Sequence, residues 1–202
     1  FDVISMLSSA AQIIVPGSAT DSGRLLPQLD TDHPDPIVLN GGIPDETVFP
    51  VDYLADVFTK IIKNNPSDSL MYGGWFGYEG CRSEIADRQN KLENISSLQP
   101  ENIIMHNGSS GCMENICKTF LNTGDVVLVE SPSFSGTVRT IQGYGAEVIA
   151  VPMTSEGVNV EFIKDVITSL SKENKKIKLF YTIPDFHNPL GIITSLHCRK
   201  EI

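Results

Sequence analysis

The sequence lacks the basic charge and the long apolar run on which two large classes of protein depend. It has 15 Lys and Arg against 25 Asp and Glu, which gives a formal net charge of -10. This balance argues against a protein that binds nucleic acid or an anionic membrane surface. The longest apolar stretch near the start, Ala10 to Pro16, is too short to span a bilayer, and no basic segment precedes it as in a secretory signal. We therefore expect an acidic, soluble, globular protein.

Cysteine is scarce, and its spacing predicts no metal site. The four cysteines are Cys81, Cys112, Cys117 and Cys198; they form no C-x-x-C motif and have no histidine at zinc-finger spacing. Free cysteines usually behave as small buried apolar residues in a reducing compartment. This favours a cytoplasmic location, with a reducing organelle as the alternative.

The two ends of the sequence predict a piece of a longer chain. The first residue is Phe1 rather than Met. At the other end, Thr194 or Ser195 is placed to cap a helix that has completed barely two turns at Ile202. A domain seldom stops inside a newly capped helix.

The 202 residues, 41% of them hydrophobic, suit one domain or one and a half. Residues 1–36 contain a polar, proline-containing stretch and are interpreted as an N-terminal arm or linker. Residues 37–202 are interpreted as part of one larger domain that breaks off soon after the loop at residues 188–191.

From residue 100 onward, apolar residues alternate between strand-like and helix-like spacing. The unbroken run Val126–Glu130 is typical of a strand that is buried on both faces. The pattern predicts strands at 102–106, 126–130, 147–151 and 177–181, helices at 113–121, 135–143 and 163–170, and an earlier amphipathic helix at 54–62. Alternating strands and helices indicate an α/β fold with a mostly parallel sheet and helices on both faces.

The first loop with unusual residues is Gly108-Ser109-Ser110-Gly111, between a predicted strand and a predicted helix. Small residues allow backbone N–H groups to approach an anion, and hydroxyls and a helix N-terminus favour a phosphate there. An ordinary capped turn would look the same. The loop has neither the G-x-x-x-x-G-K pattern of nucleotide triphosphate sites nor the G-x-G-x-x-G pattern of dinucleotide sites, so ATP and NAD are not favoured.

Two further loops follow predicted strand ends, where ligands bind in such sheets. Phe134 could stack on a planar ligand or simply belong to the core. Asn188 precedes Pro189 and is therefore held extended, so that its amide either points into the crevice or serves only as a turn former. His187 invites the interpretation of a general base, but no partner for it is visible in the sequence.

Read together, these segments resemble the fold-type I, pyridoxal-phosphate-dependent aminotransferases of class I/II, and most of all the branch acting on 2-aminoadipate, kynurenine and aromatic amino acids. The similarity runs in the family's order over residues 37–202. It rests on segments that match the family's glycine-proline entry, tyrosine-glycine, phosphate-loop, strand and asparagine-proline motifs: Asn40–Pro44 with Phe49-Pro50, Tyr72–Arg82, Gly108–Met113, Leu121–Glu130 with Phe134, Gly145–Val148 with Val151-Pro152, and Asn188–Gly191.

The resemblance implies pyridoxal 5'-phosphate (PLP) as cofactor and transamination between an amino acid and a 2-oxo acid. It places Ser109, Ser110 and Gly111 at the cofactor phosphate, Phe134 on the cofactor ring and Asn188 at the ring oxygen. Gly42 would lie beside the substrate carboxylate. Tyr72 would reach the cofactor of a neighbouring subunit, which implies a homodimer.

The resemblance assigns no catalytic residue to this chain, because the family's Schiff-base lysine follows the asparagine-proline loop at a distance and is expected beyond Ile202. Lys200 lies too close to that loop, and Arg199 cannot be assigned as the substrate-carboxylate clamp. Three alternatives stay open: a non-catalytic relative that binds cofactor or dimerises, a PLP lyase or decarboxylase on the same fold, and a regulator fused to a DNA-binding domain. The acidic balance argues mildly against the last.

Overall fold

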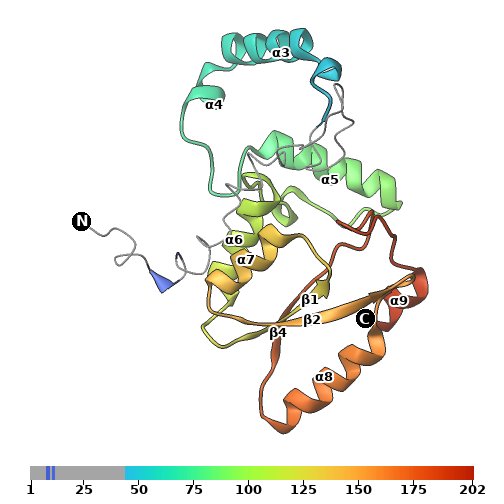
Figure 1. Cartoon of the computed structure of the whole chain (residues 1–202). Coiled ribbons are helices and arrows are strands. Elements are labelled where there is room, and N and C mark those ends of the chain that lie inside the picture. Colours follow the sequence, from blue (N-terminus) through green and yellow to red (C-terminus); the bar gives the residue numbers. More distant parts are fainter. Residues whose placement is uncertain (1–7, 10, 12–43) are drawn as a thin grey trace, which may run out of the picture. The chain divides into compact units, whose positions relative to one another are not determined.

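The structure is a computed structural model that describes residues 8, 9, 11 and 44–202 (Figure 1). The described part contains, in chain order, η2 Glu46–Val48, α3 Val51–Asn64, α4 Pro66–Leu70, α5 Glu79–Glu93, η3 Pro100–Asn102, α6 Gly108–Phe120, β1 Val126–Ser131, α7 Ser135–Gly143, β2 Glu147–Thr154, β3 Gly157–Val158, α8 Val160–Lys172, β4 Ile177–Tyr181 and α9 Leu196–Glu201. These residues divide into two compact units, one holding 44–107 and the other 108–202. Each unit is described by itself.

The unit of residues 108–202 is built on a four-stranded sheet with the order β3-β2-β1-β4. Strand β1 lies between β2 and β4 and is parallel to both, and only the short β3 runs antiparallel, to β2. Residues Val126–Glu130 of β1 are all buried, as expected for a central strand. The predicted α/β class with a mostly parallel sheet is confirmed.

Helices cover both faces of this sheet (Figure 1). Successive side chains of β1 point to opposite faces, so each face needs its own covering layer to bury them. On one face, Val127 and Val129 pack with Cys117 of α6 and Ile141 of α7. Full burial of a side chain such as Ile141 contributes about 1.5–3 kcal/mol. This face of the core therefore ties α6 and α7 to the sheet.

On the opposite face, Leu128 of β1 packs with Val151, Val158 and Cys198, and apolar residues of α8 complete the cluster. The two helices on this side begin at side-chain caps, since Asn159 accepts a hydrogen bond from the Phe162 amide and Ser195 accepts one from the Cys198 amide. The predicted cap at Ser195 is confirmed.

The unit of residues 44–107 is helical and buries very few of its apolar side chains. Ala86 is the one buried hydrophobic residue among its described residues. The predicted helix at 54–62 is present within α3, but the residues of its apolar stripe are mostly exposed. Arg82 of α5 holds the loop after α4 in place. It donates from Nε to the Gly77 carbonyl (3.1 Å) and from Nη1 to the Pro100 carbonyl (2.7 Å).

Two predicted elements differ from the structure. Residues 102–106 do not form a strand, because no described strand lies beside them to pair; the Met105 amide donates instead to the Phe76 carbonyl. The segment 108–111 is not a turn before a helix but the first turn of α6 itself. The cysteines also divide: Cys117 and Cys198 are buried as expected, Cys112 is half-buried, and Cys81 is exposed.

The predicted arm at 1–36 and Gly42 lie outside the described residues, apart from residues 8, 9 and 11. The limits of the predicted domain at 37–202 stay a prediction. Within the described part, no helix has the length and apolar character needed to cross a membrane.

Candidate functional site at the carboxyl edge of the sheet

The carboxyl ends of β1 and β4 lie side by side. The register places Val129 opposite Tyr181, so the chain leaves both strands at the same edge of the sheet. In open α/β sheets this edge is the usual place for a ligand. Phe134 follows the first of these strands and Asn188 follows the second.

Glu130, near the end of β1, binds the chain that follows β4. One carboxylate oxygen, Oε1, accepts a hydrogen bond from the Thr182 hydroxyl (2.6 Å), and the other, Oε2, accepts one from the Ile183 amide (2.7 Å). The imidazole Nε2 of His187 lies 3.1 Å from Oε2, although its N–H is not directed at that oxygen. Glu130 and His187 are each 2% exposed, and a carboxylate is stable at such a depth only when it is well bonded.

The loop between β4 and α9 is closed upon itself. The Thr194 amide donates to the Pro184 carbonyl (2.8 Å), and further in, the His187 amide donates to the Ile192 carbonyl (2.9 Å). Asn188 is exposed at the tip of this loop, after a buried His187. No described residue forms a hydrogen bond with the Asn188 side chain, so its amide is free for a ligand. The Asn188–Pro189 peptide bond is cis.

Arg199 of α9 holds the outer side of the same loop. Its guanidinium donates to the carbonyls of Thr194 (2.8 Å) and Pro184 (3.0 Å) and to Oδ1 of Asp185 (2.6 Å). The hydrogen bond from Arg199 lowers the pKa of the Asp185 carboxyl below its ordinary value. Arg199 therefore holds this loop to the start of α9.

Phe134 occupies the N-cap position of α7 and is 41% exposed, so it is not a core residue. Its ring lies against Gly136: a Cβ atom at that position would come within 2.7 Å of the Phe134 Cε1 atom. The hydroxyl Oγ of Ser133 is buried and has no hydrogen-bond partner. This loop thus offers an exposed aromatic face whose position depends on the glycine beneath it.

The third candidate segment is the N-terminus of α6. Helix α6 ends at Phe120, shortly before β1 begins at Val126, so a short turn joins them and α6 runs antiparallel to β1. From this order of elements we expect its N-terminus on the side of the carboxyl edge. Ser109 and Ser110 are exposed in its first turn, next to Gly111. The first amides of a helix have no partner within it and are suited to an anion.

The structure therefore brings the starts of two predicted loops, those of Phe134 and Asn188, to one edge of one unit. The same unit holds Ser109, Ser110 and Gly111 in the first turn of α6. Of the other predicted residues, Tyr72 belongs to the other unit, where it is fully exposed, and Gly42 lies outside the described residues. Glu130 and Thr182 were not predicted as functional residues. The one sequence signal for Glu130 is an acid that ends an unbroken apolar run.

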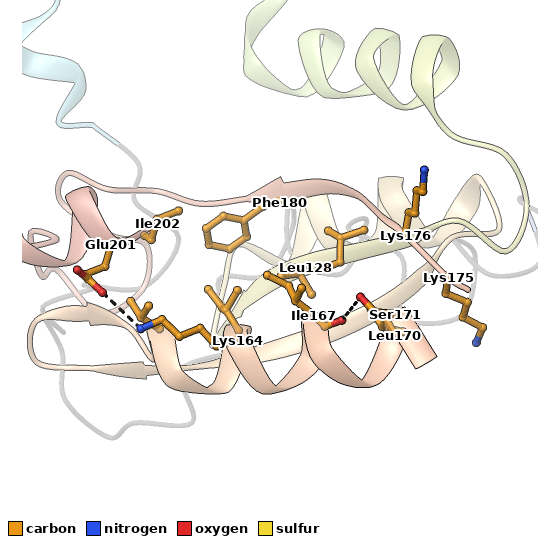
Figure 2. Close-up of a pocket in the computed structure, with 13 residues that line it drawn as sticks. Leu128, Lys164, Ile167, Leu170, Ser171, Lys175, Lys176, Phe180, Glu201 and Ile202 are labelled. Atoms are coloured by element: carbon orange, nitrogen blue, oxygen red, sulfur yellow. Dashed lines mark hydrogen bonds and ion pairs between the residues drawn. The ribbon is translucent and has the colours of Figure 1, made fainter. Parts of the chain in front are cut away.

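A separate cleft of about 500 Å³ lies on the α8 face of the sheet (Figure 2). It is lined mainly by apolar residues of α8, β1 and β4, with lysines at both ends, and contains none of the predicted site residues. Lys164 Nζ lies 2.7 Å from Glu161 and 3.4 Å from Glu201. The hydrogen bonds that Lys164 donates to Glu161 and to Glu201 raise the pKa of Lys164, so this lysine stays charged and is a poor nucleophile.

The donors at the carboxyl edge suit a planar, phosphorylated ligand rather than a metal. Among the described residues no group of three His, Cys, Asp or Glu side chains is placed to hold a metal ion. Helix amides with two hydroxyls, an exposed aromatic ring and a free amide side chain are groups that can bind a phosphate, a planar ring and a polar ring substituent.

Comparison with known proteins identifies close relatives of the whole described region. Residues 46–202 match the family "Aminotransferase class I and II". The aromatic-amino-acid aminotransferase 1 of Thermococcus litoralis is 29% identical over 184 residues, which is 91% of this chain and 43% of that protein. An uncharacterized HTH-type transcriptional regulator of Bacillus subtilis, YisV, is 31% identical over 83% of this chain and 33% of its own length.

The solved structures agree. The kynurenine aminotransferase of Pyrococcus horikoshii is 30% identical and superposes with a TM-score of 0.82, covering 98% of this chain and 48% of that one. The chain thus spans less than half the length of each of these proteins.

Proposed function

The chain belongs to the class I and II aminotransferases, and on that premise we propose that the whole protein transfers an amino group between an amino acid and a 2-oxo acid with PLP as cofactor. Enzymes of this family in general use PLP. Since the chain covers under half of its relatives, the activity is proposed for the protein that contains these residues.

The observation that carries the proposal is the bonding of Glu130, in β1, to the chain that follows β4. It holds the start of the Asn188 loop beside the end of β1, from which the Phe134 loop leaves the sheet. The fit to PLP is supported by the free amide of Asn188, by the exposed hydroxyls of Ser109 and Ser110, and by open space around Gly108 at the head of α6, where an added Cβ would meet no atom within 4 Å.

The residues of this chain would bind and orient the cofactor. The first turn of α6, with Ser109, Ser110 and Gly111, would hold the phosphate through amide and hydroxyl donors. Phe134 would lie against the ring face, and Asn188 would donate to the ring oxygen. When bound, PLP supplies the electron sink that makes the substrate's α-carbon proton acidic.

Three further assignments rest on the resemblance alone. Gly42 would lie near the substrate carboxylate, and Tyr72 would reach the phosphate in a neighbouring subunit of a homodimer. The lysine that carries the proton between carbons would lie outside residues 1–202. The exposure of Tyr72, with no side-chain partner among the described residues, is compatible with a role across an interface.

A second function is a PLP-binding regulator, which the similarity to the HTH-type protein of Bacillus subtilis favours. Such a protein would keep the cofactor site described above and add a DNA-binding segment. Turnover separates the two functions, because a regulator would bind PLP without producing free 2-oxo acid. The PLP lyase or decarboxylase alternative is separated by its product: carbon dioxide or an eliminated group instead of a 2-oxo acid.

The proposal is tested by titrating the whole protein with PLP and then with aromatic amino acids and 2-aminoadipate, following the visible absorbance. We expect a cofactor band that changes as the amino group is transferred and 2-oxo acid forms. Asn188→Ala should raise the Kd for PLP about tenfold, the effect of one hydrogen bond to a charged or strongly polar group. Gln142→Ala removes an exposed amide far along α7 and serves as the control. An unchanged Kd in Asn188→Ala would contradict the assignment of this loop.

A further inference from the structure

We propose that Glu130 is a positioning residue: through Thr182 and Ile183 it sets the direction in which Asn188 presents its amide to the cofactor. The inference rests on the proposed function. It concerns residues that do not touch the cofactor themselves, and it assigns a role to a buried acid that has none so far.

The first step concerns the free-energy cost of burying Glu130. Glu130 is the one buried carboxylate among the described residues. An apolar side chain would fill the same place in β1 more cheaply, because an acid must be desolvated. What the acid adds is a set of directed hydrogen bonds, and both of them reach the chain directly after β4.

The second step is where these bonds act. Thr182 and Ile183 are the first two residues after the end of β4, so Glu130 fixes the path by which the loop leaves the sheet. His187, packed beside the same carboxylate at 3.1 Å, is the residue immediately before Asn188. Glu130 therefore contacts the chain at both ends of the segment 182–187 that leads to Asn188, and a shift of its carboxylate would move this segment.

The third step is that Asn188 cannot fix itself. Its side chain is exposed and has no bond to a described residue, so its orientation depends wholly on the loop backbone. The loop has an inner anchor at Glu130 and an outer anchor at Arg199, which binds Asp185. The inner anchor is buried and the outer one is exposed, so the inner one is the more rigid.

The test uses the whole protein and a matched pair at Thr182. Thr182→Val removes the hydroxyl while keeping the shape, and Thr182→Ser keeps the hydroxyl. Each variant is titrated with PLP by quenching of protein fluorescence, and its unfolding by urea is recorded separately. We expect Thr182→Val to raise the Kd about tenfold, as for the loss of one bond to a charged acceptor, and Thr182→Ser to leave it within about twofold.

A double-mutant cycle separates positioning from simple stability. If Thr182 acts through Asn188, then Thr182→Val should cost nothing further in an Asn188→Ala background. Equal losses in both backgrounds, or a lower urea midpoint with an unchanged Kd, would overturn the proposal.

Two variants guard the result. Should Thr182→Val fail to fold, Glu130→Gln takes its place in the cycle, because an amide can keep one of the two bonds and the shape. Asp185→Asn weakens only the outer anchor and should leave the Kd for PLP within about twofold. A larger rise in Kd would show that the loop as a whole, and not Glu130, determines the orientation of Asn188.

If the wild-type protein does not bind PLP, the proposed function fails, which is distinct from failure of the cycle.

Discussion

The two units of the chain contrast in what their apolar residues do. In residues 108–202, two clusters of buried residues lie on opposite faces of a parallel sheet and close a core. In residues 44–107, Ala86 alone of the described hydrophobic residues is buried, while Tyr72 and Trp75 are fully exposed and much of the α3 stripe faces outward. Apolar surface on this scale is typical of a surface that is covered in an assembly. An apolar pattern alone thus tells where a helix forms, but not what covers it.

The largest effect should separate the two units by stability. Leu128→Ala removes a side chain that is 2% exposed at the centre of the sheet, and we expect it to lower the free energy of unfolding by about 2–5 kcal/mol. Phe58→Ala removes a ring that is 64% exposed on α3 and should cost about 0.5 kcal/mol or less. Urea unfolding of the whole protein measures both. A large loss for Phe58→Ala would break the contrast and show that another surface covers α3.

A second prediction concerns the loop after α4 in the helical unit. Gly77 has φ +96°, and a Cβ there would lie 2.5 Å from Met105 Cβ. Gly77→Ala should therefore lower the free energy of unfolding by about 1–3 kcal/mol. Gly73→Ala is the matched control, since an added Cβ meets nothing within 4 Å. If the two variants are equally stable, this loop is no better fixed than the rest of its unit.

The smallest effect is an electrostatic contact between the two helices that share one face of the sheet. The Tyr144 hydroxyl donates to Glu114 Oε1 (2.6 Å), and this bond raises the pKa of Tyr144 from 10 to about 12. A raised pKa means that folding favours the protonated phenol, so the stabilisation is complete below pH 10 and is lost as the pH rises toward 12.

Tyr144→Phe should accordingly destabilise the protein at pH 8 by about 0.5 kcal/mol, a small value because solvent screens the pair. The difference between wild type and variant should shrink by pH 11, as measured by urea unfolding. A difference that grows with pH would contradict the assigned direction.

The sequence was informative where packing is local. The run Val126–Glu130 and the apolar stripe of α8 could be assigned from their own residues. The spacing of apolar residues alone distinguishes a buried strand from an amphipathic helix of this length. Helix α5 was not predicted, since its sequence is strongly polar and buries only Ala86. The strand expected at 102–106 was wrong because a strand needs a partner, and a partner cannot be read from the segment itself.

The candidate site shows the same limit. Phe134 and Asn188 were expected at strand ends, and each does follow a strand, because the order of elements suffices to place them there. The same rule failed for the α6 segment, because no described strand precedes it. The role of Glu130 depends on the pairing of β1 with β4 and on the course of the chain after Tyr181. These are long-range relations, so residue types along the chain do not reveal them.

The most direct test is the structure of the whole protein crystallised with PLP. The account predicts the cofactor phosphate at the first turn of α6, its ring against Phe134 and the Asn188 amide at its ring oxygen. A cofactor found elsewhere, such as in the cleft between α8 and β4 (Figure 2), or out of reach of Asn188, would contradict it.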